Sequence, residues 1–146
     1  MKKTLLILLS LCFIISLAAC GGEEESGVYT PVKWEYISGL PAGFPALSSG
    51  VTTVDESFTG DADSIALYWN LLDKSDFDSF VSKIESWAGT EFGEPAADGT
   101  ASLKVTKDGK DYTVKAAYNG SATGNYLEGN NYDSQARIEI IEHISQ

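Results

Sequence analysis

The chain has 146 residues and a formal net charge of −11 at pH 7. Because a surface this acidic repels nucleic-acid phosphates and anionic lipid head groups, we expect no nucleic-acid partner. The roughly 120 residues from Gly27 onward are enough for one domain with a hydrophobic core, and too few for two.

The first residues have the layout of an export signal. Met1, Lys2 and Lys3 form a short basic start, and residues 4–17 (TLLILLSLCFIISL) carry no charge and are almost wholly apolar. This apolar run is shorter than the about 20 residues that a transmembrane helix needs. We therefore expect residues 1–19 to be a signal peptide that is removed on export.

The motif at the end of this segment is Leu17-Ala18-Ala19-Cys20, followed by two glycines. It resembles the lipobox of bacterial lipoproteins. The resemblance implies that Cys20 receives a thioether-linked diacylglycerol, that the signal is cut just before it, and that the new amino terminus is often acylated, as with palmitate. Two acyl chains suffice for stable anchoring. The implied location is extracytoplasmic, with the cell membrane as a partner through the lipid anchor.

The whole layout also resembles small, uncharacterised single-domain lipoproteins of bacteria, and this resemblance implies no site residue beyond Cys20. Loss of Lys2 and Lys3 with the signal would change the net charge from −11 to −13. Cys12 would leave with the signal as well. We therefore expect a mature domain without thiols or disulfides, whose stability depends on its core.

The residues after the lipobox predict a tether and then an extended segment. Residues 20–27 form the lipidated cysteine and a flexible acidic linker. Residues 28–50 are rich in proline and aromatic residues, which disfavour a continuous helix and predict extended chain packed on the domain. We expect Trp34 and Phe44 to cover an edge of the core.

Residues 51–146 are predicted to form the folded domain, which begins with a hairpin. Residues 51–59 (VTTVDESFT) favour a strand, residues 60–63 a turn, and residues 64–72 (SIALYWNLL) a second strand. In the second strand, four large apolar residues alternate onto one face: Ile65, Leu67, Trp69 and Leu71.

A helix is predicted over residues 76–88. Ser75 would cap it as the first residue of a capping box, and Gly89 would supply a left-handed stop. One apolar stripe follows the helical spacing and is interpreted as core: Phe77, Phe80, Val81, Ile84 and Trp87.

Three more strands follow the helix. Asp108-Gly109 between alternating runs predicts a two-residue hairpin joining residues 101–107 to residues 110–118. Its register would place Val105 opposite Tyr112 and Leu103 opposite Val114. Residues 119–135 are predicted to be a long loop, and residues 136–144 the last strand. The strand order ββαβββ favours an α+β, two-layer sandwich: one amphipathic helix on a mainly antiparallel sheet of four or five strands.

Few residues are suited to the commonest catalytic and metal chemistries. His143 is the single histidine, and alternation places it on the face opposite Ile138 and Ile140, exposed to solvent. Without a second histidine or a thiol in the mature domain, neither a usual zinc site nor a Cys–His pair can form. We expect no cofactor, no catalytic residue and no metal ligand.

Carboxylates leave two alternatives open. Paired carboxylates serve glycoside hydrolysis when they flank a cleft. Two groups of acids are candidates: Asp55, Glu56, Asp61 and Asp63 around the first turn, and Asp73, Asp76 and Asp78 around the helix start. A pocket lined by two of these acids would favour a carboxylate-dependent hydrolase. A calcium-binding surface domain is the other alternative, although the acids fail the EF-hand spacing.

The interpretation that we favour is a non-enzymatic binding or protein-interaction module of the cell envelope. Its partner would be an envelope protein or another ligand. Within the loop of residues 119–135, the bulky side chains are Tyr126, Leu127 and Tyr132, and exposed aromatic residues on a loop suit recognition. We therefore expect this loop to be a partner-binding surface.

Overall fold

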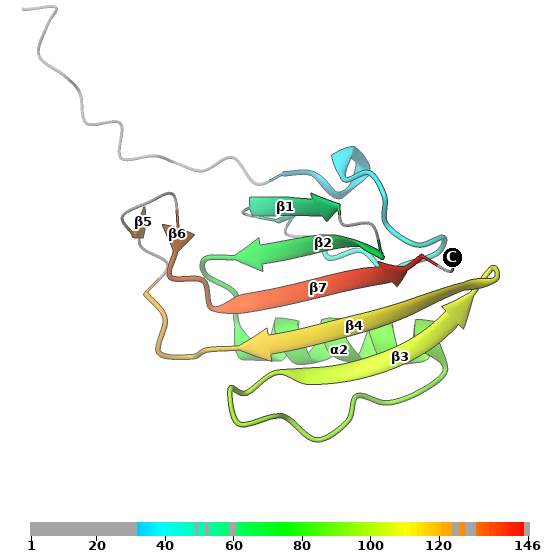
Figure 1. Ribbon diagram of the computed structural model, residues 1–146. Helices are drawn as coiled ribbons and strands as arrows, with labels where there is room; N and C mark the ends of the chain where they lie inside the picture. The colour runs from blue at the N-terminus through cyan, green and yellow to red at the C-terminus, as the bar shows by residue number, and fades with distance from the viewer. Residues whose placement is uncertain are drawn as a thin grey trace, which may run out of the picture.

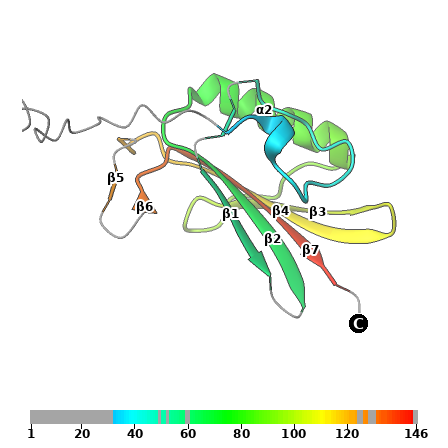
Figure 2. The same cartoon turned by 90° about the horizontal axis from the view of Figure 1, so that it is seen from above.

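The computed structural model describes residues 32–48, 50–51, 53–58, 61–123, 126–127 and 131–144. A five-stranded antiparallel sheet forms one layer, with the strands in the order β1-β2-β7-β4-β3. One helix, α2 (Lys74–Ala88), packs on one face of the sheet (Figures 1 and 2). The strands span Thr53–Phe58 (β1), Ala62–Trp69 (β2), Ala101–Lys107 (β3), Lys110–Tyr118 (β4) and Ala136–His143 (β7). The predicted α+β two-layer fold is confirmed.

The core lies between the sheet and the helix. Leu67, Ile138 and Ala116 lie side by side across β2, β7 and β4, and all three are buried. The helix contributes Phe80 and Ile84, both fully buried. Of the other predicted stripe residues, Phe77 is buried, while Val81 and Trp87 are only partly buried against the core cluster.

The segment before β1 completes the helix layer. It contains a short 3₁₀ turn, η1 (Trp34–Tyr36), and its Phe44 and Leu47 are buried. The Trp34 ring lies edge-on to Phe80, with 5.8 Å between the ring centroids. The prediction that Trp34 and Phe44 cover a core edge is therefore confirmed, and Phe44 and Leu47 belong to the core cluster.

The β3–β4 hairpin has the predicted register, with Val105 opposite Tyr112 and Leu103 opposite Val114. Asp108 and Gly109 have φ values of 52° and 76°. Positive φ at both central residues is the geometry of a type I′ turn, whose twist matches that of the paired strands.

Two predictions at the β2–α2 junction are wrong. Strand β2 ends at Trp69, so Leu71 does not share its buried face and is 68% exposed, while Leu72 is buried. The chain turns out of the sheet here, and the Leu72 amide donates to the Gln135 side chain. The helix begins at Lys74 after Asp73 without a side-chain cap, so the capping box at Ser75 is absent; the Gly89 stop is confirmed.

The predicted loop of residues 119–135 contains a small ladder. Strands β5 (Tyr126–Leu127) and β6 (Asn131–Tyr132) pair antiparallel, separate from the main sheet. In the described part of the chain, no helix is long and apolar enough to cross a membrane.

Candidate functional site

A cavity opens on the helix side of the sheet, at the end where β1 stops and β2 begins. Strand register builds it from two neighbouring rows of side chains. The outer row runs across β1, β2, β7 and β4 as Phe58, Asp63, Glu142 and Tyr112. The cavity has a volume of about 280 Å³, and the side chains of both rows line it together with the turn at Ser38 and Gly39; we call it the rim cavity.

The inner row forms the floor. Ile65 on β2 and Ile140 on β7 are direct cross-strand partners and are buried, and Glu56 on β1 is the partner of Ile65 on its other side. Figure 2 shows that β1, β2 and β7 run on past the layer formed by α2 and the preceding coil. The outer row therefore lies where the covering layer ends.

A tight turn closes one side of the rim cavity. Gly39 has a φ of +76°, a conformation that suits glycine, and it lies against Ile65. A Cβ at this position would stand 2.9 Å from Ile65 Cδ1. Ser38 Oγ donates to Glu56 Oε1 at 3.4 Å, a long hydrogen bond that joins the turn to β1.

The charge of the rim is negative. Glu56, Asp63 and Glu142 supply three carboxylates, and no described residue that lines the cavity is basic. Lys110 reaches Glu142 from outside, with 2.7 Å between Nζ and Oε1. Asp63 and Glu142 are direct cross-strand partners, an arrangement in which like charges destabilise a sheet.

Two groups at the rim, Tyr112 and Lys110, have a raised pKa. Burial raises the pKa of the Tyr112 phenol above its ordinary value of 10.0, and the negative charge of Glu142 raises it further. The hydrogen bond to Glu142, followed by the charge of that carboxylate, raises the pKa of Lys110 above 10.5. Glu142 therefore raises the pKa of Lys110, and it adds to the effect of burial on the pKa of Tyr112.

The rim carboxylates do not converge on one point. Glu56 and Glu142 lie on strands separated by β2 and two residues apart along the strand direction, which places their backbones about 12 Å apart because neighbouring strands are about 4.8 Å apart. Among the described residues, no three histidine, cysteine, aspartate or glutamate side chains are placed to hold one metal ion. Carboxylates this far apart suit an organic cation better than a divalent metal ion, because the metal ion needs its oxygen ligands close together.

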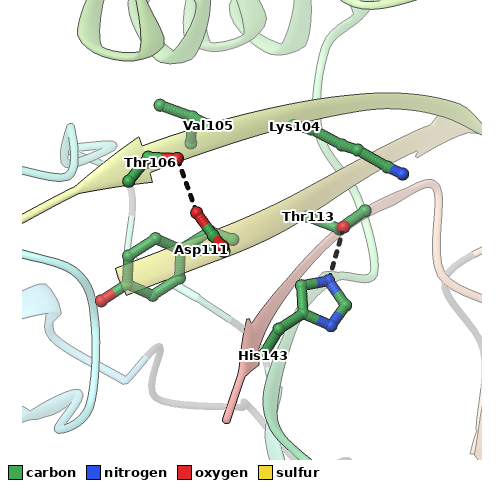
Figure 3. Close-up of a pocket in the computed structure, with 7 residues that line it drawn as sticks. Lys104, Val105, Thr106, Asp111, Thr113 and His143 are labelled. Carbon is green, nitrogen blue, oxygen red and sulfur yellow. Dashed lines mark hydrogen bonds between the residues drawn. The ribbon is translucent and has the colours of Figure 1, made fainter. Parts of the chain in front are cut away.

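A second depression lies where β3, β4 and the end of β7 meet (Figure 3). It is broad and open, with a volume of about 510 Å³. His143 Nε2 lies 2.8 Å from Thr113 Oγ1, and Thr106 Oγ1 donates to Asp111 Oδ1 at 2.6 Å. His143 is exposed, as predicted, on the face opposite Ile138. Because these polar groups are solvated and paired with one another, we assign no chemistry to them.

The sequence-predicted site residues are not brought together. Cys20 lies outside the described residues. Tyr126, Leu127 and Tyr132 belong to the β5–β6 ladder, in which Tyr126 is paired with Tyr132, and their side chains lie outside the described part. In Figure 1 this ladder lies at the end of the sheet away from the C-terminus. The rim cavity is instead lined by residues at the end of β1, the start of β2 and the end of β7. The partner-binding role of the loop stays a prediction.

The acids of the first turn are separated by the strands. Glu56 and Asp63 both line the rim cavity, while Asp55 lies on the opposite face of β1 and Asp61 lies outside the lining. Sequence reasoning missed Glu142 and Tyr112. Their signal was alternation: Glu142 continues the inward positions of Ile138 and Ile140, and Tyr112 those of Val114 and Ala116.

Comparison of this chain with protein-family models, with curated proteins and with solved structures gives no significant match.

Proposed function

We propose that this protein is a small binding module of the bacterial cell envelope, held on the membrane by lipid on Cys20, with its ligand site in the rim cavity. The observation that carries the proposal is the composition of that cavity. It combines a buried apolar floor, Ile65 and Ile140, with polar groups on the rim. Ligand sites of proteins are concave and mainly apolar, with a few polar groups that fix orientation.

The position of the rim cavity supports this role. The described chain begins at Val32, which pairs with Val51 just before the start of β1. The rim cavity lies at the other end of β1, at Phe58. A strand of this length separates the two points by about 20 Å. The cavity is therefore open at the end of the sheet away from the point where an anchored tether would enter the domain.

A blocking substitution tests the binding proposal. Ser38 is exposed at the mouth of the rim cavity, so Ser38→Trp should cover the opening without entering the core. Ser57 is also exposed but lies on the opposite face of β1, so Ser57→Trp is the matched control. A library of small fragments would be screened against the full-length protein by NMR. We expect bound fragments to shift the signals of Ile65 and Tyr112, and only Ser38→Trp to abolish the shifts. Fragments that shift no rim signal would contradict the proposal.

A carboxylate-dependent hydrolase is the second candidate, because Glu56 and Asp63 line one cavity. Such an enzyme needs one ionised and one protonated carboxyl group. Glu56 accepts a hydrogen bond from Ser38, and Glu142 is paired with Lys110.

Chromogenic glycosides separate the two candidates. Turnover that is lost in both Glu56→Gln and Asp63→Asn would support the hydrolase and replace the binding module. Fragment binding without turnover of any glycoside would support the binding module. A third variant, Glu94→Gln, removes an exposed carboxylate outside the cavity and should change neither property.

A further inference from the structure

We propose that the rim cavity binds an organic monocation, a protonated amine or guanidinium group carried on a short apolar stem. This inference rests on the proposed binding function and names the class of its ligand.

The floor of the cavity is apolar and suits an apolar stem. Ile65 and Ile140 present apolar surface at the bottom of the cavity, and only 7% and 3% of their surfaces are exposed. Covering the remaining apolar surface with carbon removes it from water, which is favourable. The volume of about 280 Å³ lies near the lower end of small-molecule sites, so the stem is short.

An exposed aromatic ring at the rim points to the same ligand. Phe58 is 70% exposed and stands beside carboxylates. A strand end that faces water can be formed by polar residues, so the strand itself does not need a phenylalanine here. An aromatic face attracts ammonium and guanidinium groups and also packs against methylene groups. Phe58 lies in the same row as Asp63, so one ligand can contact both side chains.

The charge of the rim requires a cation. Lys110 offsets one of the three carboxylates, which leaves the cavity with a net negative charge. Lys110 forms its ion pair with Glu142 and also feels the charge of Asp63, which stands directly opposite Glu142. A cation between the two would relieve their repulsion. An anionic or neutral ligand would desolvate these carboxylates without compensation.

The spacing of the carboxylates selects an organic cation over a metal ion. Calcium takes six to eight oxygen ligands at short, similar distances. Here Glu56 and Glu142 lie on strands separated by β2 and in different rows of the sheet. A substituted ammonium or guanidinium group can contact one carboxylate while its stem occupies the space between them.

Calorimetric titration of the full-length protein, purified in a nonionic detergent, tests the inference. The probes are n-butylammonium, n-butanol, butyrate, ammonium and calcium ions. We expect n-butylammonium to bind most tightly, with an affinity that falls as salt is added. Asp63→Asn should weaken n-butylammonium binding about fivefold, the scale of one ion pair, while Glu94→Gln should leave it unchanged.

A further probe, N-acetyl-lysine amide, distinguishes a free amine from a basic side chain of another protein. Tighter binding of this probe than of n-butylammonium would identify a protein segment as the source of the cation. Equal binding of butanol, or tighter binding of calcium, would overturn the organic-cation inference and leave the binding function standing. If no probe and no fragment binds at the rim, both the inference and the proposed function fail.

Discussion

Gly39 shows how one residue shapes the rim cavity. Its positive φ disfavours any side chain, and an added Cβ would also press on Ile65. Gly99 has a similar φ of +79°, but a Cβ there would meet nothing within 4 Å. Alanine substitutions at the two glycines therefore separate two free-energy costs. Both carry the cost of the backbone conformation, and only Gly39→Ala adds the cost of the contact with Ile65.

We predict that Gly99→Ala lowers the free energy of unfolding by about 1 kcal/mol, and that Gly39→Ala lowers it by about 2 kcal/mol. The larger loss comes from the displaced Ile65 side chain. Urea unfolding of both variants measures the difference. Equal losses would mean that Gly39 is not packed against the cavity floor.

Tyr112 and Lys110 make stability depend on alkaline pH. Both groups have a raised pKa in the folded protein, because Tyr112 is buried near Glu142 and Lys110 is bonded to that carboxylate. A raised folded pKa contributes stability that is complete below the unfolded value and is lost as the pH rises through the folded value. We therefore predict that the protein becomes less stable as the pH rises above about 10.

Glu142→Gln tests the cause of this pH dependence. It should lower the pKa of Tyr112 only in part, because burial is the larger cause, and it should reduce the alkaline loss of stability. The absorbance of the phenolate, taken as the difference between the protein and its Tyr112→Phe variant, measures the titration. An unchanged midpoint in Glu142→Gln would show that the carboxylate does not act on the phenol.

Helix α2 is held mainly by Phe80 and Ile84, both fully buried, while Trp87 lies at the border of the helix layer. The Phe80 ring meets Trp34, Phe44 and Trp69 edge-on. Trp87 instead contacts Phe44 and donates its indole N–H to the Ala42 carbonyl at 3.1 Å. The helical spacing in the sequence predicted that both Phe80 and Trp87 lie in the core.

We predict that Phe80→Ala costs about 3–5 kcal/mol of stability, as expected for a fully buried aromatic residue, and that Trp87→Ala costs at least about 1 kcal/mol less. Chemical unfolding with the same denaturant ranks the two. A larger loss of stability for Trp87→Ala than for Phe80→Ala would contradict the prediction, because it would mean that Trp87 contributes more than Phe80 to holding the helix on the sheet.

The elements differ in how well the sequence predicts them. The β3–β4 hairpin follows from local signals, the Asp108-Gly109 turn and the alternation on either side. The rim cavity does not, because it needs β7 inserted between β2 and β4, and no local pattern specifies which distant strands pair. The β2–α2 junction was misplaced for a related reason: a contact with Gln135, remote in sequence, sets the backbone of Leu72 there.

At the scale of the whole molecule, we propose a lipid-anchored tether and a domain whose ligand site lies at the far end of β1. The anchor depends on the motif around Cys20. We predict that Cys20→Ala blocks the incorporation of labelled fatty acid and leaves unprocessed precursor. Cys12→Ala is the matched control, because Cys12 lies within the proposed signal and should be dispensable. Labelled fatty acid in the Cys20→Ala protein would refute the anchor.

The most direct test of the central claim locates the bound cation. Nuclear Overhauser effects between n-butylammonium and the full-length protein report which side chains the stem touches. We expect contacts from the butyl protons to the methyl groups of Ile65 and Ile140 and to the Phe58 ring, and their loss in Ser38→Trp. Contacts confined to other parts of the protein, or none while binding is saturated, would contradict a ligand site in the rim cavity.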